Sequence, residues 1–128
     1  MKKYLLLLAC LIYLPALAQT SVHHLVLFTF KPGISREDER FKKAVELLEV
    51  LPQVIPFIQD FRAGLNFSKR PVAVDYGLMV VLQDEKSLNE YLEHPAHKAA
   101  AAAWKEIADW KIADFPAPAK NQFAGNKN

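Results

Sequence analysis

The sequence predicts a small α+β domain with its elements in the order β-α-β-β-α-β. Two observations carry this prediction. Four short segments are rich in β-branched and aromatic residues, and two longer segments repeat apolar residues at helical spacing. The chain has 128 residues, which is the length of a single domain.

The first half of the chain predicts a strand, a helix and a second strand. Residues 21–30, "SVHHLVLFTF", form the first strand, which "KPG" ends. Residues 35–52 form the helix, with Ser35 as its N-cap and Pro52 as its end. One apolar stripe follows this helix: Phe41, Ala44, Val45, Leu48 and Leu51. Residues 57–67 form the second strand.

The second half predicts a strand, a broken helix and a last strand. A third strand over residues 74–83 is followed by Asp84, which caps a helix over 85–94. Pro95 begins a further helix over 95–110, since proline suits the first helical position and five alanines follow soon after. Residues 111–115 form a short last strand. This order of elements is ferredoxin-like, with both helical regions on one face of a four-stranded antiparallel sheet.

The two ends of the chain are expected to lie outside this domain. Residues 1–18 have two lysines, an apolar run and an A-x-A site, which is the layout of a signal peptide cleaved after Ala18. The domain is then expected over 19–116 and a disordered tail over 117–128. A lipoprotein cut before Cys10 is a second, weaker interpretation. The location expected is periplasmic or secreted, with no membrane attachment after cleavage.

Cleavage would leave a chain without cysteine chemistry, excess basic charge or a common catalytic motif. Cys10 is the only cysteine, so the mature chain would have no disulfide, thiolate nucleophile or cysteine metal site. Removing Lys2 and Lys3 from the 16 basic residues leaves 14, equal to the 14 acidic ones. This balance argues against nucleic acid as a partner. Phosphate-binding and common hydrolase motifs are absent from the sequence.

The strands predict a dimer because both of their faces are apolar. In the first strand, Leu25 and Leu27 point one way, and His24 points the other way with Val26 and Phe28. An antiparallel sheet with helices on one face usually has a polar second face. A second copy of the sheet is the simplest cover, which predicts a homodimeric α/β barrel with helices outside.

Histidines supply the candidate site. His24 points into a large apolar region, which the barrel interpretation places in the barrel interior, and its imidazole can act near neutral pH. His97 lies in the first turn after Pro95, where the helix dipole favours the neutral imidazole. His94 is expected to close one helix and start the next. A structural role remains open for His24, His97 and Tyr91, and no metal or organic cofactor is expected.

Four segments of the chain resemble the stress-responsive A/B barrel (Dabb) family. They are "HHLVLFTFKPG", "FRAGLNFS", "DYGLMVVLQDEKSLNEYLEHPAHKA" and "IADF". The resemblance implies a ferredoxin-like unit that dimerises into an α/β barrel. A plant branch of this family cyclises linear polyketides with a His of the first strand and a Tyr and a His of the second helical region. The matching positions here are His24, Tyr91 and His97.

Two functional hypotheses follow from the sequence. In the first, the protein binds a small, partly apolar molecule in a pocket between sheet and helices and performs cofactor-free acid/base chemistry of a cyclase or lyase type. His97 would take a proton next to a carbonyl, while His24 and Tyr91 hold the oxygens. In the second, the protein is a non-catalytic, stress-responsive binding or structural protein. A haem role, found in other dimeric barrels of this shape, would need an open axial histidine beside a flat slot, which the sequence does not show.

Overall fold

A computed structural model describes residues 20–117 and confirms the predicted order of elements. The strands are β1 (Ser21–Phe30), β2 (Asp60–Leu65), β3 (Tyr76–Leu82) and β4 (Ala108–Ala117). The helices are α1 (Glu39–Glu49), α2 (Leu51–Val54), α3 (Glu85–Glu93) and α4 (Pro95–Ile107). The expected signal peptide and all but the first residue of the expected tail lie outside the described residues.

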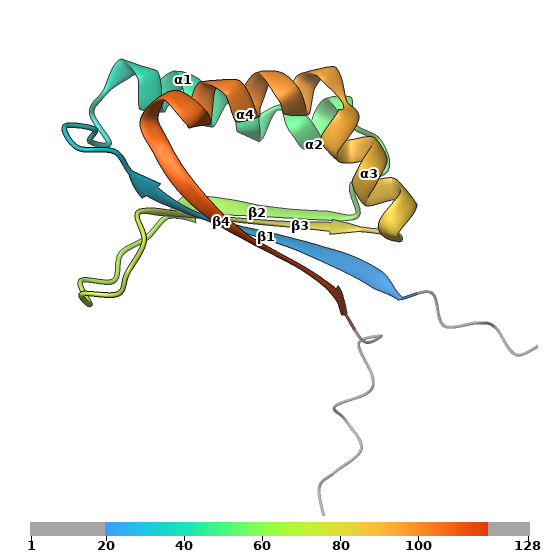
Figure 1. Cartoon of the computed structure of the whole chain (residues 1–128). Helices are drawn as coiled ribbons and strands as arrows, with labels where there is room; N and C mark the ends of the chain where they lie inside the picture. The colour runs from blue at the N-terminus through green and yellow to red at the C-terminus, as the bar shows by residue number, and fades with distance from the viewer. Residues whose placement is uncertain (1–19, 118–128) are drawn as a thin grey trace, which may run out of the picture.

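The four strands form one antiparallel sheet in the order β2-β3-β1-β4, which is the ferredoxin-like arrangement (Figure 1). All four helices lie over the same face of this sheet. In the register of the sheet, His24 of β1 lies opposite Val80 of β3 and Asp114 of β4. These three side chains therefore share the face that the helices cover, which we call the helix face.

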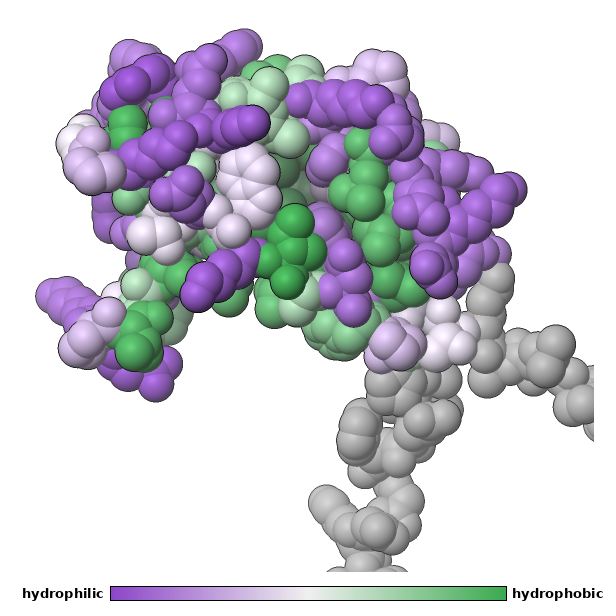
Figure 2. Space-filling model, viewed as in Figure 1, coloured by the Kyte–Doolittle hydropathy of each residue, from purple (hydrophilic) through white to green (hydrophobic). Residues whose placement is uncertain are grey.

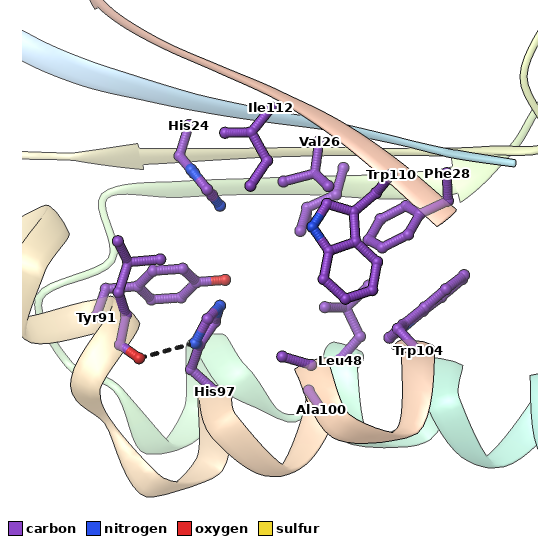
Figure 3. Close-up of a pocket in the computed structure, with 13 residues that line it drawn as sticks. His24, Val26, Phe28, Leu48, Tyr91, His97, Ala100, Trp104, Trp110 and Ile112 are labelled. Carbon is purple, nitrogen blue, oxygen red and sulfur yellow. Dashed lines mark hydrogen bonds between the residues drawn. The ribbon is translucent and has the colours of Figure 1, made fainter. Parts of the chain in front are cut away.

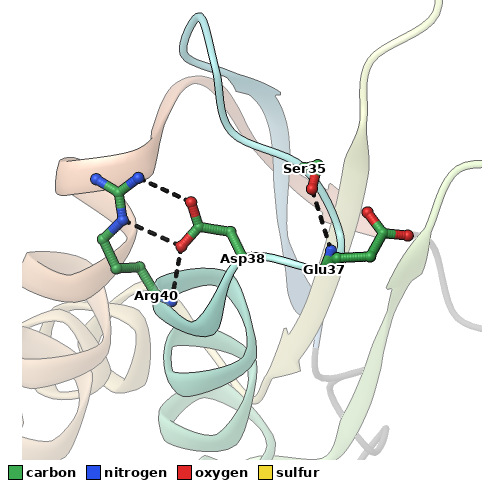
Figure 4. A network of polar contacts seen from close by, with 4 residues as sticks. All are labelled: Ser35, Glu37, Asp38 and Arg40. Atoms are coloured by element: carbon green, nitrogen blue, oxygen red, sulfur yellow. Dashed lines mark hydrogen bonds and ion pairs between the residues drawn. The ribbon is translucent and has the colours of Figure 1, made fainter.

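Helix α1 begins at Glu39, three residues later than a cap at Ser35 predicts. Its N-cap is Asp38, whose carboxylate accepts the Arg40 backbone N–H at 2.9 Å and two further bonds from the Arg40 guanidinium (Figure 4). The Ser35 hydroxyl instead accepts the Glu37 N–H at 3.3 Å, within the preceding turn. Aspartate and serine are about equally favoured as N-caps, and here the Asp38 carboxylate also forms an ion pair with Arg40, which a serine hydroxyl does not. Pro52 also differs from its expected role, because α1 ends at Glu49 and the proline lies inside the short α2.

The break between α3 and α4 follows the prediction closely. Asp84 caps α3 by accepting the Ser87 N–H at 2.8 Å. His94 has extended backbone and its Nδ1 accepts the Ala96 N–H at 3.1 Å, so this side chain caps α4. Pro95 is the first residue of α4. His94 is thus a structural residue at the junction.

Helix α4 ends at Ile107, and the expected helix over 95–110 is too long. The Ile107 carbonyl accepts the Lys31 N–H at 2.8 Å, and from Ala108 onward the chain pairs with β1. Strand β4 therefore has ten residues, not the five expected over 111–115, and includes the buried Ala117. Hydrogen bonds with β1 decide this boundary. From Ala108 onward the backbone groups pair with β1, whereas helical spacing alone predicts that they pair within α4.

The core lies between the sheet and the helices. Trp104 of α4 is its largest member, 1% exposed, and its indole N–H donates to the Ala44 carbonyl of α1 at 3.1 Å. Phe41, Ala44 and Leu48 of the predicted α1 stripe are buried, and Leu51 of α2 is completely so. The contact between α1 and α4 thus joins two segments that are far apart in the sequence.

The opposite face of the sheet has no helix over it (Figure 1). We call it the free face. Leu25 and Leu27 of β1 and Met79 and Val81 of β3 share it, and all four are only partly buried. On the space-filling view, hydrophobic residues are exposed on the sheet side while hydrophilic residues dominate the helices (Figure 2). The predicted two-sided apolar character of the sheet is therefore present.

Candidate active site

A cavity of about 140 Å³ lies between the helix face of the sheet and helices α3 and α4 (Figure 3). Most of its wall is apolar, including Val26, Phe28, Leu48 and Trp110. An engineered protein cavity of about 150 Å³ is large enough to hold benzene. The cavity therefore has the size of one aromatic ring, and it is the place where the three predicted site residues meet.

His24 enters this cavity from the sheet. Its side chain is 3% exposed, and its Nδ1 lies 2.6 Å from the Oδ1 of Asp114 on the neighbouring strand β4. A carboxylate oxygen accepts, so Nδ1 is the nitrogen that carries hydrogen in this contact. The other ring nitrogen, Nε2, points into the cavity (Figure 3).

Tyr91 enters from α3, and its hydroxyl also points into the cavity (Figure 3). The residue is 0% exposed, and its hydroxyl oxygen is the buried side-chain polar atom without a hydrogen-bond partner in residues 20–117. Burial raises the pKa of this hydroxyl above its ordinary value, so it stays protonated and can donate. A buried hydroxyl without a partner is unfavourable, and a polar ligand atom would satisfy it.

His97 enters from the first turn of α4, half-buried. Its Nδ1 donates to the Leu92 carbonyl at 3.0 Å, which leaves Nε2 facing the cavity (Figure 3). Burial is the main cause of a lowered His97 pKa, and the bond to Leu92 acts in the opposite direction. The neutral form expected for His97 is therefore favoured. The cause is desolvation rather than the helix dipole, which the sequence analysis had given as the reason.

The three polar groups form one cluster with the tyrosine ring in the middle. The Tyr91 ring centroid lies 5.7 Å from that of His24 and 4.6 Å from that of His97. When both imidazole rings are neutral, the cluster offers two Nε2 lone pairs and one hydroxyl donor to whatever enters the cavity. Such a set can remove a proton and hold an oxygen without further groups.

Within residues 20–117, no three histidine, cysteine, aspartate or glutamate side chains come close enough to hold a metal ion. None of the helices in this part of the chain is long and apolar enough to cross a membrane.

One expectation about the site is wrong. The barrel interpretation placed His24 in the barrel interior, which would be formed by the face without helices. The register places His24 on the helix face instead, opposite Val80, while Leu25 and Val81 lie on the free face. The parity of the strand was read correctly, but parity alone does not tell which of two apolar faces the helices cover.

Sequence reasoning missed Asp114 and Trp110. Trp110 was assigned to the end of a helix, whereas it lines the cavity from β4. With β4 extended to Ala108, residues 108, 110, 112 and 114 share one face, and Asp114 is the acidic member of that set. An aspartate on the inward face of a strand beside the His24 strand was the available signal.

The fold and the cluster together define a ferredoxin-like α+β protein with a largely apolar site between sheet and helices. The chain belongs to the stress responsive A/B barrel domain (Dabb) family, whose pattern matches residues 22–117. An uncharacterized protein of Streptomyces coelicolor is 38% identical over 94 residues, which cover 73% of this chain and 97% of that protein.

Two solved structures illustrate the fold. A dimeric ferredoxin-like protein of unknown function from Bacteroides fragilis is 25% identical, with a TM-score of 0.65 over 76% of this chain and 96% of its own. A hydroxynitrile lyase from Passiflora edulis has a TM-score of 0.68 and 10% identity, over 78% of this chain and 95% of its own. At 10% identity the second likeness concerns the fold alone.

Proposed function

We propose that this protein binds an uncharged, ring-sized carbonyl compound between the sheet and the helices, and that it withdraws a proton next to the carbonyl carbon. The observation that carries this proposal is the convergence of three polar atoms on one apolar cavity. Two of them, the Nε2 atoms of His24 and His97, can accept a proton. The third is the unpartnered Tyr91 hydroxyl, which can donate to the carbonyl oxygen.

The character of the ligand follows from the wall. No lysine or arginine lines the cavity, so a charged ligand would lose its hydration without a compensating ion pair. A compound with an aromatic or similar ring would fill the apolar part, beside Val26, Phe28 and Trp110. Its carbonyl oxygen would then lie against Tyr91, with the neighbouring C–H bond toward an imidazole.

Acetophenone in deuterated water provides a direct test, since loss of its methyl protons can be followed by NMR. We expect the protein to catalyse this exchange, and Tyr91→Phe to lower the rate on the order of 100-fold, the contribution of one acid/base group. Glu90→Gln is the matched control, because Glu90 is exposed on the same helix. A rate no greater than that of buffer would contradict the acid/base proposal.

Ligand binding is measured separately, by ligand-observed NMR with acetophenone. Ala101→Phe is the diagnostic variant, because Ala101 lines the cavity and is only half-buried, so a larger side chain there fills the cavity with less strain than at the buried Ala100. Binding that this variant abolishes, without exchange in the unsubstituted protein, would assign the non-catalytic binding role. Binding that it leaves unchanged would place the ligand elsewhere.

We also infer a homodimer that forms through the free face. Leu25, Met79 and Val81 lie there without a covering helix. The segment between β2 and β3 extends on the side away from the helices (Figure 1), and its Phe67 and Val72 are 95% and 87% exposed. Large exposed apolar surfaces usually mark an interface.

Light scattering tests the homodimer and should give twice the mass of one chain. Val81→Asp should reduce the measured mass to that of one chain, whereas Asn89→Asp on the outside of α3 should leave it unchanged.

We further propose that the chain is exported, with cleavage after Ala18. The support is the pattern of residues 1–18 alone. The intact mass of the protein recovered from a cell envelope or periplasmic fraction tests it. A mass that includes residues 1–18 in the soluble cytoplasmic fraction would contradict export, and a lipid-modified Cys10 would support the lipoprotein interpretation instead.

A further inference from the structure

We propose that His24 and Asp114 work as one proton-accepting unit, in which Asp114 fixes the hydrogen on Nδ1 of His24 and stabilises the imidazolium, so that Nε2 of His24 is the base of the site. This assigns the base role to His24, whereas the sequence had suggested His97. The part of the inference that concerns the reaction rests on the proposed function. The part that concerns the imidazole rests on the geometry alone.

The first step is the choice of tautomer. The 2.6 Å contact joins Nδ1 of His24 to a carboxylate oxygen, which has no hydrogen to give when ionised. Nδ1 must therefore be the donor, and the lone pair of the neutral ring is on Nε2, inside the cavity. Asp114 is a positioning residue in this sense, because it acts on the ligand only through His24.

The second step compares the two imidazoles. A proton accepted in a largely apolar cavity creates a charge that burial disfavours. His24 has a carboxylate at 2.6 Å to offset that charge, while His97 has only the Leu92 carbonyl at 3.0 Å. The His97 pKa is lowered, chiefly by burial and further by His24. His97 is therefore suited to accept a hydrogen bond from a ligand hydroxyl, and His24 is suited to accept the proton itself.

The third step is the surroundings of the pair. The titratable groups that face His24 are Asp114 of β4, Tyr91 of α3 and His97 of α4, while β3 presents Val80. Asp114 is thus the anionic group among them. Its side chain is 39% exposed on the outermost strand of the sheet, so its charge is hydrated while it holds a buried ring.

The proton transfer then balances as follows. The C–H bond next to the ligand carbonyl breaks, and an N–H bond forms at Nε2 of His24. The electron pair moves to the carbonyl oxygen, which accepts the Tyr91 hydroxyl hydrogen bond. The positive charge is on the His24 imidazolium, and the Asp114 carboxylate stabilises it. The imidazolium gives the same proton, or a deuteron after exchange with solvent, back to carbon, and the ketone is restored.

The tautomer is tested on the full protein without ligand, by long-range ¹H–¹⁵N NMR of the imidazole nitrogens at a pH where the ring is neutral. We expect His24 to show a protonated Nδ1 and a bare Nε2. Asp114→Leu, which removes the acceptor, should release this preference, and Asp109→Asn, on the same strand but on the free face, should not. A hydrogen on Nε2 in the unsubstituted protein would overturn the inference, whatever the result of any activity assay.

The role of the negative charge on Asp114 is tested by the acetophenone exchange assay with the nearly isosteric variant Asp114→Asn. We expect the exchange rate constant to fall about 10- to 100-fold, within the range for acid/base groups, with little change in half-saturation. Asp114→Glu should recover part of the loss, and His24→Gln should lose at least as much as His97→Gln. Equal rates for Asp114→Asn and the unsubstituted protein would overturn the role of the carboxylate. A protein with the expected tautomer but no exchange would contradict the proposed function and leave the positioning of His24 by Asp114 supported.

Discussion

Replacing Tyr91 with phenylalanine removes one oxygen atom, and its effect on stability is expected to be opposite to its effect on activity. The ring is completely buried between His24 and His97, and a phenylalanine ring keeps all of that packing. The hydroxyl has no partner within residues 20–117, so its removal takes away a desolvated group rather than a hydrogen bond. A buried polar group without a partner costs on the order of 1–3 kcal/mol. We therefore expect Tyr91→Phe to be more stable than the unsubstituted protein by about 1 kcal/mol.

The assay is thermal unfolding at a fixed protein concentration, because the midpoint of the proposed dimer would depend on concentration. For a domain of this size, a gain of about 1 kcal/mol raises Tm by roughly 4–8 °C. Trp104→Phe is the contrasting variant, since it removes the indole hydrogen bond to the Ala44 carbonyl and leaves unfilled space around a side chain that is 1% exposed. We expect that variant to be clearly destabilised. A Tyr91→Phe protein less stable than the unsubstituted protein would refute the reasoning, because it would mean that the hydroxyl makes a stabilising bond.

Three further predictions concern pH, packing and capping. Burial lowers the His97 pKa, so the unfolded chain binds more protons than the folded one and stability should fall as pH drops below about 6.5. Urea unfolding at pH 7.5 and 5.5 should show a smaller loss of stability for His97→Gln than for the unsubstituted protein, and an equal loss would contradict this. Leu51→Ala should cost about 2–5 kcal/mol in the free energy of unfolding, whereas Val54→Ala, 44% exposed, should cost far less; similar values would argue against the packing described. Asp38→Ala should lower the urea midpoint and Ser35→Ala should not, and the reverse order would restore Ser35 as the cap.

The sequence predicted most of the secondary structure because local signals there agree with the fold. The caps at Asp84 and His94 and the start at Pro95 depend on neighbours within a few residues, and all three are confirmed. The boundary at Ile107 was wrong for the opposite reason. Helical spacing continues through Trp110, but pairing with β1 across about 80 residues of sequence takes over at Ala108.

The candidate site divides in the same way. His24 and His97 stand out in the sequence because histidine is one of few side chains that titrate near neutral pH, and the structure brings both to one cavity. Asp114 does not stand out, because an aspartate in a short polar-apolar strand is ordinary. Only the register of β1 against β4 places its carboxylate at Nδ1 of His24.

By itself, the amino-acid sequence determined the order of elements, the family and the residue types of the site. These depend on periodicity, caps and motifs, which act over short stretches of chain. Tertiary structure alone decided which apolar face of the sheet the helices cover, where α4 becomes β4, and that Asp114 meets His24. Each of these is a pairing between distant segments, and such pairings are selected by the packing and hydrogen bonding of the whole sheet rather than by any one segment.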